Sequence, residues 1–141
     1  MLIAYLSGFA LAFAAFAYAT VIGLDRDRAF YPTVLIVIAS TYVLFAAIGA
    51  DARTLIQESL ILTVFLVVAA VGFKRNPWLI VLAIAAHGVL DVTHGSVVTN
   101  GGVPRWWPAF CMTYDLTAAA FFAWTLRRSP ALAKPRHQVG S

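Results

Sequence analysis

The sequence has little charge, a single cysteine and no long hydrophilic stretch. Only 11% of its 141 residues are charged, whereas a soluble domain carries roughly 25%. A chain this short cannot hide 62% hydrophobic residues from water, because small domains leave much of their surface exposed. The lone Cys111 excludes an internal disulfide and a metal cage made of cysteine alone. Lipid is therefore the solvent that fits this composition.

Five apolar segments are long enough to cross a bilayer, for which a helix needs about 20 residues. The first segment is interpreted as a retained helix, because it lacks the basic start and the cleavage site of a signal peptide. The predicted spans are about 2–24, 30–50, 54–73, 78–95 and 105–126, with Gly95 as the C-cap of the fourth helix. The predicted fold class is all-α, an integral membrane bundle of five transmembrane helices formed by residues 1–128. Residues 129–141 are expected to be a disordered cytoplasmic tail.

Basic residues are distributed unevenly between the two predicted faces of the membrane. One face holds Arg26, Arg28, Lys74, Arg75, Arg127, Arg128, Lys134 and Arg136, and the other holds Arg53 and Arg105. Because cytoplasmic loops carry the excess of Lys and Arg, we expect the N-terminus outside and the C-terminus in the cytoplasm. The basic residues form no patch, so the net charge of +4 indicates no nucleic-acid partner.

Five ionisable side chains fall inside the predicted spans, where such groups are costly and usually mark function. They are Glu58, His87, Asp91, His94 and Asp115. At 1.5 Å of rise per residue, all of them lie in the outer half of the membrane. His87, Asp91 and His94 are spaced i, i+4 and i+7 and so share one stripe of the fourth helix. Asp115 shares a face with Cys111 on the fifth helix, an antiparallel neighbour, so we expect Asp115 to reach His87 or Asp91.

Two chemistries fit this set of side chains. Neutral imidazoles and carboxylates are ligands of zinc, iron or manganese. The predicted metal ligands are His87, Asp91 and His94, and the predicted catalytic residues are Asp115, Glu58 and Tyr114. In that hypothesis Asp115 is a ligand or general base, and Tyr114 donates or orients a proton. Alternating carboxylates and imidazoles also form proton relays.

Each of these residues also has a purely structural interpretation. Glu58 lies in a polar opening segment that can face interfacial water, and His94 can interact with the carbonyl end of its helix. Asp91 can be the partner of a neighbouring histidine, and Cys111 is interpreted as a small packing residue. Asp115 is the hardest to explain without a function, because no Lys or Arg lies on a neighbouring turn.

The fourth and fifth helices resemble a set of small, uncharacterised bacterial multi-pass membrane proteins. The resemblance rests on the segments HGVLDVTH at 87–94 and VPRWWPAFCMTYD at 103–115, together with FYPT at 30–33. It covers about half of the chain. It implies that these segments form one unit and that the protein lies in a bacterial inner membrane, but it implies no activity.

The leading hypothesis is a metal-dependent membrane enzyme that acts on a lipid or another apolar substrate near the outer leaflet. The alternatives are a proton or metal-ion transporter or channel subunit, and a structural or accessory subunit. An enzyme needs an outer cleft that reaches His87, and a transporter needs a polar path to the inner face. The inner halves of the helices carry little that is polar beyond Tyr18, Thr20 and Thr63. The lipid bilayer is the expected partner, and the sequence is also compatible with a homo-oligomer.

Overall fold

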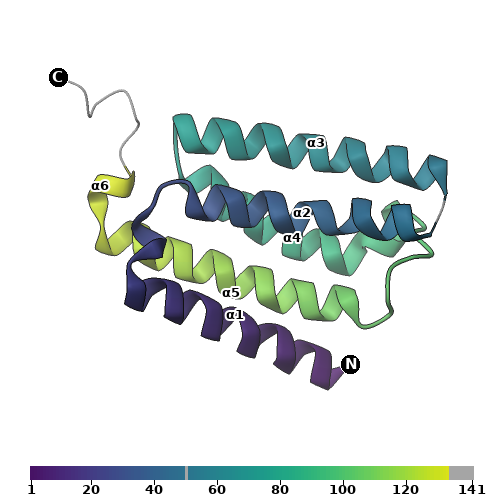
Figure 1. The fold of residues 1–141 in the computed structure, drawn as a ribbon, viewed down its shortest axis with the longest axis horizontal. Coiled ribbons are helices and arrows are strands. Elements are labelled where there is room, and N and C mark those ends of the chain that lie inside the picture. Colours follow the sequence, from purple (N-terminus) through teal and green to yellow (C-terminus); the bar gives the residue numbers. More distant parts are fainter. Residues whose placement is uncertain (50, 134–141) are drawn as a thin grey trace.

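The computed structural model describes residues 1–49 and 51–133, and this part of the chain is a bundle of helices without strands (Figure 1). The elements are α1 (Leu2–Ile22), the 3-10 turn η1 (Leu24–Arg26), α2 (Phe30–Ile48), α3 (Ala52–Lys74), α4 (Trp78–Val97), α5 (Trp107–Arg128) and α6 (Pro130–Ala133). Five of these helices are long and apolar enough to cross a membrane. This confirms the predicted fold class and supports a multi-pass membrane protein.

Helix α4 lies in the middle of the bundle. It packs against α5, α3 and α2, while α1 covers another side of α5 and α2 packs along α3 (Figure 1). Successive long helices run antiparallel, so the N-terminus, the α2–α3 turn and the α4–α5 loop share one end of the bundle. We call this the amino end and the opposite end the basic end.

The basic end is named for the distribution of Lys and Arg. Among the described residues it holds Arg26, Arg28, Lys74, Arg75, Arg127 and Arg128, whereas the amino end holds Arg53 and Arg105. Residues 130–133 of the predicted tail form α6. Ala50 and residues 134–141, which include Lys134 and Arg136, lie outside the described residues.

Small residues determine how α1 meets α5. Ala4, Gly8 and Ala12 recur every fourth position and are all buried. A Cβ atom at Gly8 would collide with the α5 backbone and with the Thr113 hydroxyl. Small side chains at this spacing allow two helix backbones to approach closely. Thr113 Oγ1 also donates a hydrogen bond of 3.0 Å to the backbone carbonyl of Tyr5, which ties the two helices together.

Toward the basic end the interior is apolar and aromatic. The rings of Tyr31 and Phe122 are stacked with centroids 3.9 Å apart, and Phe16 stacks on Tyr31 at 5.8 Å. Leu35 and Ile84 are fully buried in the same core. This layer joins α1, α2, α4 and α5 by side-chain packing, and offset aromatic pairs of this kind add to the stability from area burial.

Several helix ends differ from the prediction by one or two residues, with α2 ending at Ile48 and α5 spanning Trp107–Arg128. Two further differences follow from local capping. Helix α1 ends at Ile22, because Gly23 takes the left-handed conformation with a φ of 78°, which favours glycine. Helix α3 begins at Ala52, because Asp51 is its N-cap and accepts hydrogen bonds from first-turn N–H groups. The Thr54 hydroxyl, followed by the backbone N–H groups, lowers the pKa of Asp51 below its usual range.

Gly95 does not end α4, so the prediction of a glycine C-cap is wrong. The helix continues to Val97, and Val98 is the C-cap, with its N–H donating to a carbonyl one turn earlier. A glycine C-cap requires the left-handed conformation, which Gly95 does not adopt. Helix α4 is therefore longer at the amino end than its sequence suggests.

Candidate functional site

The stripe of ionisable residues on α4 is buried in the centre of the bundle. His87 and Asp91 are each 1% exposed and His94 is 3% exposed. Gly88 lies against α5, where an added Cβ would stand 3.1 Å from the Cβ of Asp115. The close approach of the two helices explains how Asp115, which is fully buried, reaches the α4 stripe.

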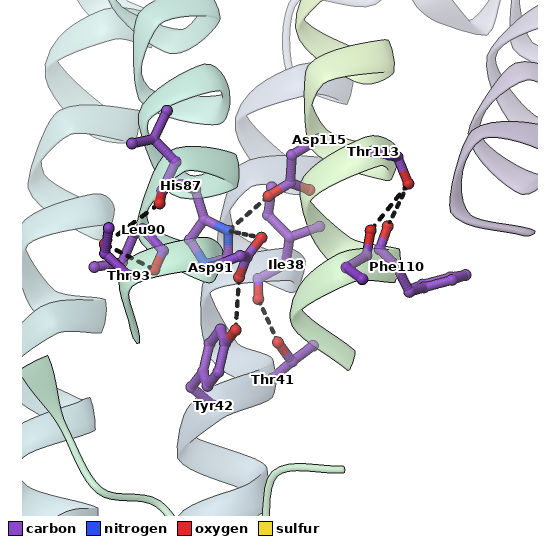
Figure 2. A network of polar contacts seen from close by, with 12 residues as sticks. Ile38, Thr41, Tyr42, His87, Leu90, Asp91, Thr93, Phe110, Thr113 and Asp115 are labelled. Carbon is purple, nitrogen blue, oxygen red and sulfur yellow. Dashed lines mark hydrogen bonds and ion pairs between the residues drawn. The ribbon is translucent and has the colours of Figure 1, made fainter. Parts of the chain in front are cut away.

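His87, Asp91 and Asp115 meet in one polar cluster (Figure 2). His87 Nδ1 is hydrogen-bonded to Asp115 Oδ2 at 2.7 Å and lies 3.7 Å from Asp91 Oδ2. From α2, the Tyr42 hydroxyl donates a hydrogen bond of 2.7 Å to Asp91 Oδ1. The prediction that Asp115 would lie within reach of His87 or Asp91 is confirmed.

Cys111 is the fourth member of this cluster. It is 3% exposed, and one ligand atom from each of His87, Asp91, Cys111 and Asp115 lies within 4.8 Å of all the others. We call these four residues the four-ligand group. Sequence reasoning interpreted Cys111 as a packing residue, although its position four residues before Asp115 on one helix face was the signal that pointed to the site.

His94 lies outside the four-ligand group and pairs with Glu58 instead. His94 Nε2 is 2.9 Å from Glu58 Oε1, and both side chains are buried. Asn100, from the α4–α5 loop, donates a hydrogen bond of 2.9 Å to the same Glu58 oxygen. The predicted metal ligand His94 and the predicted catalytic Glu58 therefore form a second polar pair, joining α3 to α4. No sequence signal singled out Asn100.

Tyr42 connects the two polar clusters. Its ring stacks on the His94 ring, with centroids 3.9 Å apart and an interplanar angle of 18°, while its hydroxyl binds Asp91. The ring of Tyr114, the predicted proton donor, packs against Phe16 and Phe110. The tyrosine whose hydroxyl is hydrogen-bonded to the cluster is therefore Tyr42 on α2.

The four-ligand group contains two aspartates that form no ion pair with an arginine or lysine among the described residues. Asp91 accepts a hydrogen bond from Tyr42 and also has a hydrogen-bonding contact with Cys111. Asp115 is hydrogen-bonded to His87 and contacts Asp91. Asp91 Oδ2 and Asp115 Oδ1 are buried without a hydrogen-bond partner among the described residues. Two buried carboxylates are costly unless they are protonated or balanced by positive charge. A divalent cation supplies two positive charges and accepts lone pairs from both oxygens.

The donor set and its geometry can hold a metal ion. In a tetrahedral zinc site with bonds of 2.0–2.3 Å, the ligand atoms stand about 3.3–3.8 Å apart. The ligand atoms of the four-ligand group lie up to 4.8 Å apart, so a bound ion would require the side chains to draw slightly closer together. Two oxygens, a nitrogen and a sulfur match the preferences of zinc and ferrous iron.

The chain matches no protein-family model, no curated protein and no solved structure. The site is therefore interpreted from its own chemistry.

Proposed function

We propose that this protein is a multi-pass membrane protein that binds one divalent metal ion in the four-ligand group, with zinc favoured and ferrous iron next. The observation that supports it is the meeting of His87, Asp91, Cys111 and Asp115 in the interior of an apolar bundle. Manganese fits less well, because a cysteine sulfur is a soft ligand and manganese prefers oxygen.

The charges of the group favour a bound cation. With both aspartates ionised and His87 neutral, a divalent ion makes the centre neutral, and a Cys111 thiolate leaves one negative charge. Without metal, the single His87 imidazole faces both carboxylates, hydrogen-bonded to Asp115 and 3.7 Å from Asp91. The other contacts of Asp91 are with the uncharged groups of Tyr42 and Cys111. The metal relieves the cost of burying both carboxylates in a low-dielectric interior.

The closed geometry favours a centre that stabilises the bundle in this conformation. Structural zinc sites have four protein ligands, whereas catalytic sites keep one position open. Each member of the four-ligand group is at most 3% exposed, so a lipid cannot reach it without movement of α4 against α5. An enzyme that acts on an apolar substrate near the outer leaflet would require α4 to move away from α5 so that the substrate could reach the group.

The second polar pair lies between the four-ligand group and the amino end of the bundle. Metal binding to cysteine and aspartic acid releases protons, and Tyr42 lies between Asp91 and the His94–Glu58 pair. Thr54, one turn before Glu58, lines a pocket of about 440 Å³ at the amino end. We propose that the released protons leave toward that pocket by way of a water molecule, because the stacked rings of Tyr42 and His94 pass no proton between them.

The location and the family of the protein are also proposed from its sequence. We propose an inner-membrane protein with its N-terminus outside, which follows from the basic residues. Membership of a family of small bacterial membrane proteins is proposed from the segments at 87–94 and 103–115. The runner-up, transport across the membrane, is disfavoured by the aromatic core between the four-ligand group and the basic end.

Elemental mass spectrometry of the purified protein tests the metal centre. Wild type should carry about one zinc or iron per chain, the stoichiometry of a single closed four-ligand site. His87→Ala should abolish binding, and Cys111→Ser should weaken the binding of zinc more than that of manganese. His94→Ala is the matched control, a histidine on the same helix outside the four-ligand group, and should retain the metal.

The alternative is a hydrogen-bonded network that never holds a metal. In that case His87→Ala leaves a buried carboxylate unpaired and costs about 3–5 kcal/mol. The double variant His87→Ala with Asp115→Asn should then recover much of that stability. A wild type without stoichiometric metal after loading with zinc, iron and manganese, together with this recovery, would refute the proposed centre.

A further inference from the structure

A buried aspartate fixes the loop at the basic end. Asp25 is only 4% exposed, and its Oδ2 accepts hydrogen bonds from Thr20 at 3.0 Å and from Thr125 at 3.2 Å. These bonds join η1 to both α1 and α5. Arg26, the next residue, is therefore held beside the end of α5.

A cavity of about 280 Å³ opens at this point, and its charge suits an anion. It is lined by Arg26 from η1 and Arg128 from the end of α5, with Asp25 in its wall. The Arg128 guanidinium lies 4.3 Å above the Trp124 ring, which fixes its direction. The two arginines are exposed, whereas the Asp25 carboxylate is buried: its Oδ2 takes two hydroxyl hydrogen bonds, and its Oδ1 is buried without a hydrogen-bond partner among the described residues. An anion that enters the cavity therefore meets the guanidinium groups first.

An apolar groove continues from this cavity along α1 and α5. It measures about 500 Å³ and shares Thr20 and Trp124 with the cavity. Phe13 and Ala17 line one side, and Phe121 lines the other. From Thr20 to Phe13 the groove runs about 10 Å along α1, at 1.5 Å per residue. A polar, basic head and an apolar groove on the surface of a membrane bundle match the two parts of a phospholipid.

We propose that this surface binds one anionic phospholipid, with its phosphate between Arg26 and Arg128 and one acyl chain in the groove between α1 and α5. Basic pockets between transmembrane helices recognise anionic head groups in this way. A free phosphate would use the cavity without the groove, and a second copy of the chain would cover the groove without needing the arginines. The proposal does not rest on the metal centre.

Native mass spectrometry of the full chain in detergent tests the lipid site. Phosphatidylglycerol and phosphatidylcholine with identical acyl chains are added in turn, and the dissociation constants are compared. Wild type should prefer phosphatidylglycerol by at least about fivefold, because each arginine near an anionic head group contributes about that factor. The Arg26→Ala, Arg128→Ala double variant should bind both lipids equally.

Two further variants separate a shaped site from general attraction to a basic surface. Arg127→Ala removes the same charge at the same end but not from the cavity, and it should keep the preference. Ala120→Phe fills the groove. It should weaken the binding of both lipids without changing the ratio of their dissociation constants. Equal binding of the two lipids by wild type, or a preference lost as fully in Arg127→Ala as in the double variant, would overturn the proposal. A wild-type dimer that retains no lipid would also overturn it.

Discussion

At the scale of single residues, the proposed metal centre depends on side chains that orient the residues of the four-ligand group. Tyr42 makes two different contacts, a hydrogen bond to Asp91 and a ring stack on His94. Groups that hydrogen-bond to metal ligands fix the orientation of those ligands and raise metal affinity. Tyr42 therefore links the four-ligand group to the Glu58–His94 pair without being a ligand itself.

The variant Tyr42→Phe separates these two contacts. It removes the hydroxyl that orients Asp91 and keeps the ring that stacks on His94, so the fold should be retained. We expect the zinc affinity to fall about 10–100-fold, as measured by competition with a chromophoric chelator. Tyr18→Phe is the control, because Tyr18 is 66% exposed and should leave the affinity unchanged. An unaltered affinity in Tyr42→Phe would remove Tyr42 from the supporting role.

At the scale of helices, the close contact between α1 and α5 fixes the position of α1 in the bundle. It uses the small residues Ala4, Gly8 and Ala12, and the Thr113 hydroxyl reaches across to α1. Membrane helices gain little from the hydrophobic effect when they associate in lipid, so tight packing and interhelical hydrogen bonds hold them together. The α1–α5 contact should therefore be sensitive to side-chain volume at Gly8.

The variant Gly8→Leu should destabilise this contact. The new side chain meets the α5 backbone, which cannot move aside as a flexible side chain would. Overpacking of this kind costs about 1–3 kcal/mol or more, which should appear as a lower melting temperature in detergent. Ala10→Leu adds similar volume on the exposed face of the same helix and should change the melting temperature little. Equal melting temperatures for the two variants would contradict the packing argument.

At the scale of the whole molecule, an aromatic layer separates the four-ligand group in the middle of the bundle from a buried carboxylate at the basic end. The four-ligand group joins α4 and α5, and Asp25 lies at the basic end. Between them, Phe122 stacks on Tyr31 in the apolar core. The sequence indicated an inner half nearly free of polar groups, and the buried Asp25 is the addition that the structure makes.

The orientation of the whole molecule can be tested directly. The described residues place six basic side chains at the basic end and two at the amino end. Because Lys and Arg are retained in the cytoplasm, a C-terminal reporter that is active only in the cytoplasm should give signal. A reporter that is active only outside the cytoplasm should be silent at that position and active in the α4–α5 loop. The reverse pattern would show that the bundle is inverted.

Part of the site could be predicted from the sequence because it lies on two continuous helices. The spacing of His87 and Asp91 is fixed by helix geometry, and the short linker makes α4 and α5 neighbours. His94 shares that stripe and yet pairs with Glu58, because the choice of partner depends on where α3 lies. Cys111 was assigned to packing for a similar reason, since its role depends on which face of α5 meets α4.

The sequence by itself determined that lipid surrounds the protein, how many long helices it has, and how far along each helix the ionisable groups lie. Apolar length and backbone geometry decide these features within each segment, without reference to any other. The tertiary structure alone decided that Tyr42 bridges the two polar clusters and that Asp25 folds back between Thr20 and Thr125. These contacts join residues on different elements, so their geometry depends on how the helices pack, as it does where Gly8 and Gly88 let α1 and α4 approach α5 closely.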